Sequence, residues 1–118
     1  MLKLHMDNSR LYQELRVQLE HELVEINGLR DASEAARAPV SLDQQSVGRL
    51  SRMDAMQGQA MAQAAERRRQ QRAGMISAAL ERLDEGEFGF CLGCGEPTPE
   101  GRLKADPTVT RCVGCASA

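Results

Sequence analysis

Two pairs of cysteines near the C-terminus constrain this 118-residue chain more than any other feature of its sequence. Cys91 and Cys94 form one Cys-x-x-Cys pair, Cys112 and Cys115 form the other, and seventeen residues separate the pairs. A two-residue gap lets both sulfurs of a pair reach one ion at about 2.3 Å, and two such pairs complete a tetrahedral site. The spacing predicts one structural Zn²⁺ ion. A redox dithiol pair and structural disulfides are the alternatives.

Four sulfur ligands leave no open position on the metal for water, so the predicted zinc site is structural and not catalytic. The segment that carries it, residues 85–118, has few large apolar side chains, and we expect metal binding to supply most of its folding free energy. The sequence contains no phosphate-binding loop and no nucleophile elbow. We therefore predict that the protein is not an enzyme.

The first third of the chain has the periodicity of an amphipathic helix. Asp7-Asn8-Ser9 offer cap-forming side chains, and apolar residues then recur at steps of four and three. This pattern predicts a helix over about residues 8–35. Its apolar stripe consists of Leu11, Leu15, Leu19, Leu23, Ile26 and Leu29.

A second helix is expected after a proline-containing turn. Pro39 disfavours a helical conformation in the residue before it, which places the turn at about residues 36–41. Ser41 and Gln44 have the spacing of a capping box, so the second helix is expected over about residues 42–84. Its inward stripe is predicted to be softer, with Leu50, Met53, Met61, Ala64, Met75, Ala79 and Leu83.

These patterns predict a mainly α fold. The short turn makes the two helices antiparallel, so residues 1–84 are expected to form a long helical hairpin, or coiled coil. Residues 85–118 are expected to form the small zinc finger. We also predict that Met53, Met56, Met61 and Met75 pack inside the hairpin, and that the protein is a monomer.

The charge distribution and hydropathy of the chain limit the kinds of partner and location that we expect for it. The formal net charge is -2, but residues 84–118 carry six acids and three bases, which argues against a finger that grips phosphates. No apolar run approaches the ~20 residues that span a bilayer. The N-terminus lacks the pattern of an export signal, so a reducing cytoplasm is the expected location.

The cysteine segment resembles the C4 zinc finger of the DksA/TraR family of bacterial transcription regulators. The resemblance rests on Asp84-Glu-Gly-Glu-Phe-Gly-Phe-Cys-Leu-Gly-Cys-Gly95, on Gly101-Arg-Leu-Lys-Ala-Asp-Pro107 and on Cys112-Val-Gly-Cys115. The predicted hairpin lies where this family has its coiled coil. The resemblance implies a protein that binds RNA polymerase directly, with its hairpin in the secondary channel and without sequence-specific DNA binding. In some members the alarmone ppGpp takes part.

The hairpin tip departs from the family pattern. Well-studied members carry an Asp-x-x-Asp-x-Ala motif there, and this chain keeps only Asp43 of it. Asp43 is a candidate for contact near the polymerase active centre, although an acid in the first turn of a helix also stabilises the helix dipole. A later segment that resembles short family members supplies further candidate partner-binding residues, namely Arg49, Arg52, Asp54 and Ala55. Solvated pairing among them is the alternative.

Arg67, Arg68 and Arg69 form, with Arg72, the densest basic cluster of the chain. The cluster is a candidate contact for polymerase, nucleic acid or a tetraphosphate ligand, and pairing with Glu14, Glu20 and Glu22 is the alternative. No aromatic residues interleave with it, so base stacking is not expected. Two other functions stay open from the sequence, a zinc-finger nucleic-acid-binding module and a coiled-coil adaptor.

Overall fold

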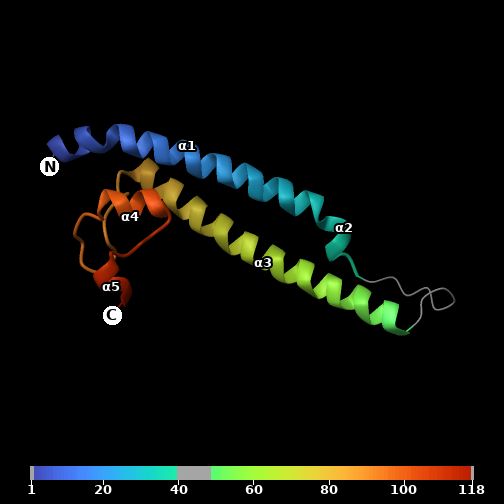
Figure 1. Cartoon of the computed structure of the whole chain (residues 1–118). Coiled ribbons are helices and arrows are strands. Elements are labelled where there is room, and N and C mark those ends of the chain that lie inside the picture. The colour runs from blue at the N-terminus through green and yellow to red at the C-terminus, as the bar shows by residue number, and fades with distance from the viewer. Residues whose placement is uncertain (1, 40–48, 118) are drawn as a thin grey trace. The chain divides into compact units, whose positions relative to one another are not determined.

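The computed structural model describes residues 2–39 and 49–117, with side chains described for residues 9–39 and 51–117. In these ranges the chain forms α1 (Leu2–Ala32), α2 (Glu34–Arg37), α3 (Arg49–Glu85), α4 (Glu100–Ala105) and α5 (Val113–Ser117) (Figure 1). The β-structure there is limited to one isolated antiparallel bridge between Phe90 and Pro97. None of the described helices is long and apolar enough to cross a membrane.

The chain divides into two compact units. The first unit consists of Met1–Leu23 and Gly74–Ala118, and the second consists of Val24–Ala73. Within each unit, a segment of α1 lies beside a segment of α3 that runs in the opposite direction (Figure 1). The predicted fold class, an antiparallel helical hairpin with a small four-cysteine module, is confirmed.

The core of the first unit follows the predicted leucine stripe of α1. Leu11, Leu15 and Leu19 are buried, and from α3 they are joined by Ile76 and Ala79. Leu19 and Ile76 are fully enclosed. Each large aliphatic side chain buried in this way stabilises the pairing of the helices by about 1.5–3 kcal/mol. The stripe continues in the second unit through Ile26, but Leu29 is 55% exposed, so its predicted burial was wrong.

The predicted inward stripe of α3 was wrong in its methionines. Met53, Met61 and Met75 are 56%, 69% and 46% exposed, and Met56 is also exposed, so none of them packs inside the hairpin. The buried positions of α3 are instead Glu66, Ile76 and Ala79. Met75 and Ile76 are adjacent, so they cannot both face the partner helix. The large aliphatic Ile76 takes the inward position, and the flexible Met75 is left exposed.

The ends of α1 also differ from the prediction. The helix begins at Leu2 and not near residue 8, because Leu2-Lys-Leu-His-Met6 are compatible with helix and a cap-forming residue permits a start without forcing one. Its other end is a break at Ser33, followed by the four-residue α2. Ala38 then adopts the extended backbone (φ -63°, ψ 152°) that a following proline favours. Asp43, the capping box and the predicted start of the second helix near residue 42 lie outside the described residues.

Candidate metal centre

The cysteine module begins where α3 ends. The N–H of Glu87 donates to the carbonyl of Arg82 at 2.9 Å, and the N–H of Gly86 donates to the carbonyl of Leu83 at 3.4 Å. These two bonds, with a positive φ of 74° at Gly86, form a Schellman motif that stops the helix. The chain therefore turns sharply out of α3 and reaches Cys91 within a few residues.

An aromatic pair joins this turn to α1 in the first unit. The rings of Tyr12 and Phe88 meet edge to face, with centroids 5.1 Å apart and planes at 77°. Phe88 is only 2% exposed. Gly89, with φ +90°, lies directly against the Tyr12 hydroxyl and ring, and a Cβ there would stand 3.1 Å from Tyr12 Cζ. Tyr12 thus packs against the turn that leaves α3, at the open end of the hairpin.

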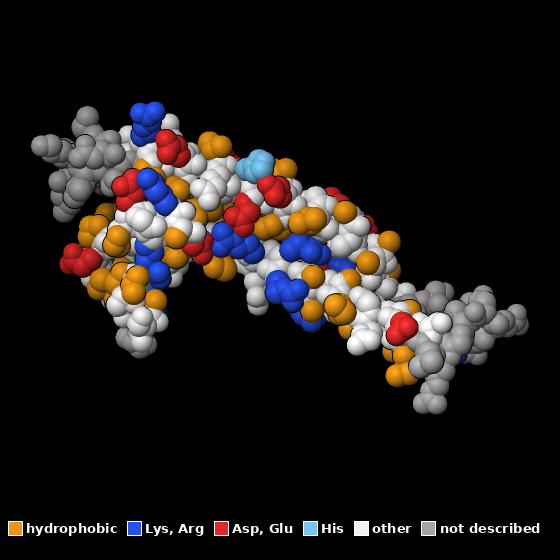
Figure 2. Space-filling model, in the orientation of Figure 1, with side chains coloured by type: hydrophobic (Ala, Val, Ile, Leu, Met, Phe, Trp, Pro, Cys, Tyr) orange, Lys and Arg blue, Asp and Glu red, His pale blue; other side chains and the backbone are white. Residues whose placement is uncertain are grey.

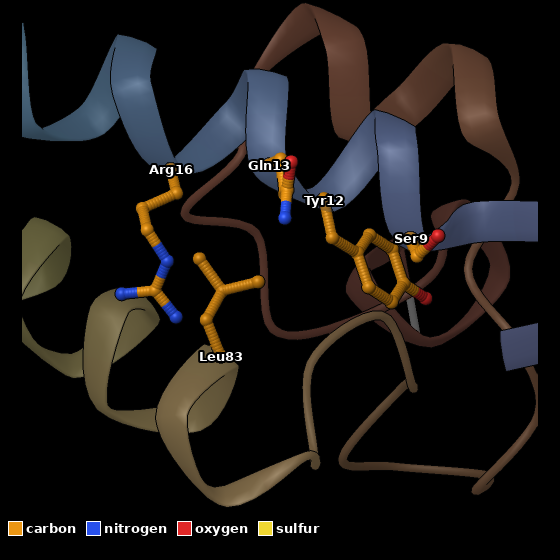
Figure 3. A pocket seen from close by; sticks show the side chains of 5 residues that line it. All are labelled: Ser9, Tyr12, Gln13, Arg16 and Leu83. Carbon is orange, nitrogen blue, oxygen red and sulfur yellow. The ribbon is translucent and has the colours of Figure 1, made fainter. Parts of the chain in front are cut away.

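The same unit has a shallow pocket of about 290 Å³ beside this aromatic pair. Ser9, Tyr12, Gln13 and Arg16 project into it from α1, and Leu83 projects from α3 (Figure 3). The charged group among these residues, Arg16, is paired with Asp84 of α3 at 2.8 Å. This pair is largely exposed, so it is worth no more than about 1 kcal/mol.

Backbone N–H groups from both Cys-x-x-Cys pairs are directed toward the sulfur of Cys91. The N–H groups of Gly93 and Cys112 both donate to Cys91 Sγ at 3.3 Å. The N–H of Gly95 closes the first turn on the carbonyl of Cys91 at 2.9 Å. The second pair opens α5. The N–H of Leu92 donates to the carbonyl of Thr110 at 2.7 Å and so holds the two turns together.

The geometry of the four sulfurs fits one tetrahedral metal ion. The sulfurs of Cys91, Cys94, Cys112 and Cys115 all lie within 4.8 Å of one another. Zinc–sulfur bonds of about 2.3 Å require sulfur–sulfur edges of about 3.8 Å, and Cys94 Sγ lies 3.9 Å from Cys112 Sγ. In the part of the chain that the structure describes, the cluster consists of four cysteines, and a soft thiolate set suits zinc. We conclude that the site binds one structural Zn²⁺ ion, as the spacing predicted.

Electrostatics within the cluster favour a bound cation. The N–H groups of Cys112, Cys94 and Gly93 lower the pKa of Cys91 to about 6. The side chains of Cys112, Cys91 and Cys94 crowd Cys115 and raise its pKa to about 12. Four thiolates cannot coexist at this distance unless a positive charge lies between them, and a coordinated thiol is deprotonated outright. When bound, the zinc ion supplies that charge.

The seventeen-residue insert between the cysteine pairs has a small core that the sequence analysis underestimated. Leu103 of α4 is 3% exposed, and Pro107 and Thr108 are also buried. Asp106 Oδ1 accepts bonds from both the N–H and the hydroxyl of Thr108, at 3.1 and 2.7 Å. The guanidinium of Arg102 donates to the carbonyl of Arg111 at 2.8 Å. The insert is thus held by a side chain of α4 and by the turn after α4, next to the second cysteine pair.

The predicted partner-binding residues lie outside this centre. Lys and Arg side chains gather along the middle of α3 (Figure 2), where Arg67 and Arg68 are exposed. Asp54 and Ala55 are exposed and Arg52 is half-buried, all on α3. Asp43 lies outside the described residues, as does the side chain of Arg49. The geometry does not bring these residues to the cysteine cluster, and their role as contacts stays a prediction.

Arg69 differs from the exposed Arg67 and Arg68 because its side chain is half-buried and bonded within the hairpin. Its Nε pairs with Glu66 Oε1 at 3.0 Å on the same helix, and its Nη2 donates to Ser33 Oγ at 3.0 Å. Glu66 is 4% exposed, a buried carboxylate in the seam between the helices. The sequence analysis missed Glu66 and Ser33. For Glu66 a sequence signal existed. Glu66, Ala73 and Leu80 are spaced by seven residues and so lie on one face of α3, where Glu66 is buried and the other two are half-buried.

Comparison with known proteins agrees with this centre. Residues 86–118 match the family model described as the prokaryotic dksA/traR C4-type zinc finger. The chain is 45% identical over 40 residues to the RNA polymerase-binding transcription factor DksA of Haemophilus influenzae, and 46% identical over 41 residues to an uncharacterised protein of Aquifex aeolicus. These stretches span 34% and 35% of this chain, but only 28% of each relative.

The fold likeness reaches further along the chain than the sequence likeness. The structure of transcription factor DksA2 from Pseudomonas aeruginosa matches with a TM-score of 0.55 and 26% identity. The match covers 92% of this chain and 73% of that one. The hairpin and the finger therefore occur together, in this order, in a solved structure.

Proposed function

The chain belongs to the DksA/TraR family, and from this premise we propose that it is a transcription regulator that binds RNA polymerase directly. One observation carries the proposal: the family's zinc finger at residues 86–118 is joined to a helical hairpin, and the whole arrangement matches DksA2 over 92% of the chain. We assign no catalytic step to the protein. Its place of action is then the cytoplasm, with the polymerase.

We propose that the hairpin enters the secondary channel of the polymerase. Support comes from the paired helices, whose α3 alone has 37 residues, a length of about 55 Å at ~1.5 Å per residue. Exposed charged side chains on α3, among them Asp54, Arg67 and Arg68, are available for contact. Asp43, Arg49, Arg52 and Ala55 complete the proposed contact set. Zinc acts by fixing the finger at the base of the hairpin and not by chemistry.

Sequence-specific DNA binding is not part of this proposal. The finger has a net negative charge in residues 84–118, and bound zinc with four thiolates adds a further negative balance. A surface of this sign repels phosphates. The basic side chains lie instead on α3, where they suit an acidic protein surface or, with the polymerase, an alarmone such as ppGpp. We propose a monomer as the active form.

Binding to core RNA polymerase tests the proposal first. The zinc-loaded chain should be retained by immobilised core polymerase, and a variant with Cys112→Ser and Cys115→Ser should bind less because its finger is unfolded. Retention should fall only moderately with salt, whereas binding to bare nucleic acid would fall steeply and would favour the nucleic-acid-binding alternative. Failure of the zinc-loaded chain to bind core polymerase would refute the proposal.

The tip residues are tested by transcription in vitro. Asp43→Ala and Asp54→Ala should both leave binding to polymerase nearly unchanged, and the one that acts at the active centre should abolish the effect on initiation. Glu81→Ala, an exposed acid elsewhere on α3, is the matched control. If neither variant alters initiation while wild type does, the proposed role of the tip acids is wrong.

A further inference from the structure

A polar cluster in the second unit surrounds Ser33 with arginine side chains. Ser33 lies at the break between α1 and α2, and its Oγ accepts bonds from Arg37 Nε at 3.1 Å and from Arg69 Nη2 at 3.0 Å. The same hydroxyl donates to the carbonyl of Arg30 at 3.2 Å. Two positively charged groups from different helices thus converge on one neutral oxygen atom.

Among the described side chains, the positive charge of Arg37 has only neutral partners. Arg37 donates its second bond, from Nη2, to the carbonyl of Arg30 at 2.7 Å, so both of its acceptors are neutral. In the part of the chain that the structure describes, no carboxylate pairs with Arg37. Guanidinium groups bind phosphate and carboxylate far more strongly than they bind a hydroxyl. The arrangement therefore suits a larger and negatively charged group at Ser33.

Arg69 can serve such a group without giving up its present partner. Its Nε is bound to the buried carboxylate of Glu66, which also accepts a bond from Gln70. The Nη2 that faces Ser33 is a separate donor on the same planar fork. An anion at Ser33 would add a charge-assisted bond to Nη2 while the pair with Glu66 stays intact.

We propose that Ser33 is a phosphorylation site, and that Arg37 and Arg69 hold its phosphate. The donor is a nucleoside triphosphate, used by a serine kinase. The Ser33 hydroxyl loses its proton and Oγ forms a bond to the γ-phosphorus, the bond from that phosphorus to the bridging oxygen breaks, and nucleoside diphosphate leaves. Phosphorylation adds about two negative charges and three acceptor oxygens, enough for one to three new bonds to arginine.

Access for a kinase is favourable here. Ser33 is half-buried, but its neighbours Asp31, Ala32, Glu34 and Ala35 are exposed. α2 has only four residues, and a helix this short has little stability of its own, so opening it costs little. Arg30 lies three residues before the serine, a basic residue that a kinase can read through its charge. The exposed Asp31 and Glu34 oppose the phosphate only weakly, because solvent screens them.

The test is the zinc-loaded full chain with phosphoserine incorporated at position 33. The matched control carries phosphoserine at position 77, an exposed serine of α3 with Glu81 one turn away. Phosphorus NMR over a pH series should give a second phosphate pKa about one unit lower at position 33 than at position 77, because two cations stabilise the dianion. Arg37→Gln should remove most of this difference. Arg37→Gln is the informative variant, since it leaves Glu66 and Arg69 paired.

Two results would overturn the proposal. One is an equal phosphate pKa at positions 33 and 77, and the other is a lowered pKa at position 33 that Arg37→Gln does not change. Accessibility is tested separately with a serine kinase that selects arginine three residues before its target. Phosphate should appear at Ser33 in wild type, and at least tenfold more slowly in Arg30→Gln. Failure to modify wild type would also overturn the proposal, since it would place Ser33 out of reach.

Discussion

Replacing Gly89 by alanine is the sharpest test of how the finger is fastened to the hairpin. Gly89 has φ +90°, and an added Cβ would run into the Tyr12 hydroxyl. A non-glycine residue at such a backbone angle costs about 1–3 kcal/mol. Displacing Tyr12 from its edge-to-face contact with Phe88 costs about 0.5–1.5 kcal/mol more. We therefore expect Gly89→Ala to destabilise the zinc-loaded protein by about 1.5–4.5 kcal/mol.

Denaturant unfolding of the zinc-loaded protein, followed by circular dichroism at 222 nm, measures this loss. In a melting experiment this loss of stability corresponds to a decrease in Tm of about 6–18 °C, at ~4 °C per kcal/mol for a chain near this length. Gly58→Ala is the matched control, because Gly58 lies inside α3 with no atom within 4 Å of an added Cβ. That variant should be stabilised by up to ~1 kcal/mol, since alanine is the better helix former.

A double-mutant cycle separates the two costs. In a Tyr12→Phe background the hydroxyl nearest to the new Cβ is gone, while the backbone angle of Gly89 is unchanged. Gly89→Ala should then cost about 1 kcal/mol less than it costs in wild type. An equal cost in both backgrounds would refute the steric part of the reasoning. A cost below about 0.5 kcal/mol in wild type would refute all of it.

Three further predictions concern the metal and the buried ion pair. Cys112→Ser should lose stoichiometric zinc by atomic absorption and unfold the finger, because structural zinc supplies about 10–16 kcal/mol of apparent binding free energy; zinc retained at one ion per chain would contradict this. Acidification should release zinc only at a pH below about 6, because the pKa of Cys91, lowered from 9.0 to about 6 in the metal-free site, is lowered further when the thiolate is bound to zinc; a zinc-indicator titration that shows complete release above pH 6 would contradict it. Glu66→Ala should cost about 1.5–3 kcal/mol in denaturant unfolding, because Arg69 is left half-buried without its carboxylate, whereas Glu81→Ala should change stability by less than ~0.5 kcal/mol.

The metal centre was predictable because covalent spacing restricts it so strongly. Two residues between the cysteines of a pair limit each turn to few conformations, and four sulfurs at this spacing favour one zinc ion over a redox dithiol pair or disulfides. The leucine stripe of α1 was predictable for a similar reason, since Leu11, Leu15 and Leu19 are all large and follow one helical phase. In both cases several residues independently supported the same structural prediction.

The inner face of α3 was not predictable in the same way. This helix has many alanines and arginines, so the choice between faces depends on a few large residues, and Met75 and Ile76 are adjacent. A set of scattered methionines can therefore be assigned to the wrong face of the helix, because no other residue in the sequence contradicts that choice. The burial of Glu66 was not predictable for a related reason. Its carboxylate is stable inside the hairpin only when it pairs with Arg69, and the position of Arg69 depends on tertiary contacts. The hydroxyl of Ser33 likewise accepts bonds from arginines of two helices, and the bond from Arg69 is a tertiary contact.

Zinc binding and helix pairing are linked within the first unit through only a few residues. Closing the site fixes Cys91, and Cys91 is three residues from the buried Phe88, whose ring contacts Tyr12 of α1. The N-terminal part of α1 is separated in sequence from the cysteines by the whole of α3. The contact between Tyr12 and Phe88 therefore links the metal site to α1 in space. The affinity for zinc must then include part of the free energy of docking α1, since both depend on the same aromatic pair. In the proposed regulator, loss of zinc should therefore loosen the packing of α1 on the finger within the first unit, so a site without catalytic chemistry can still affect function.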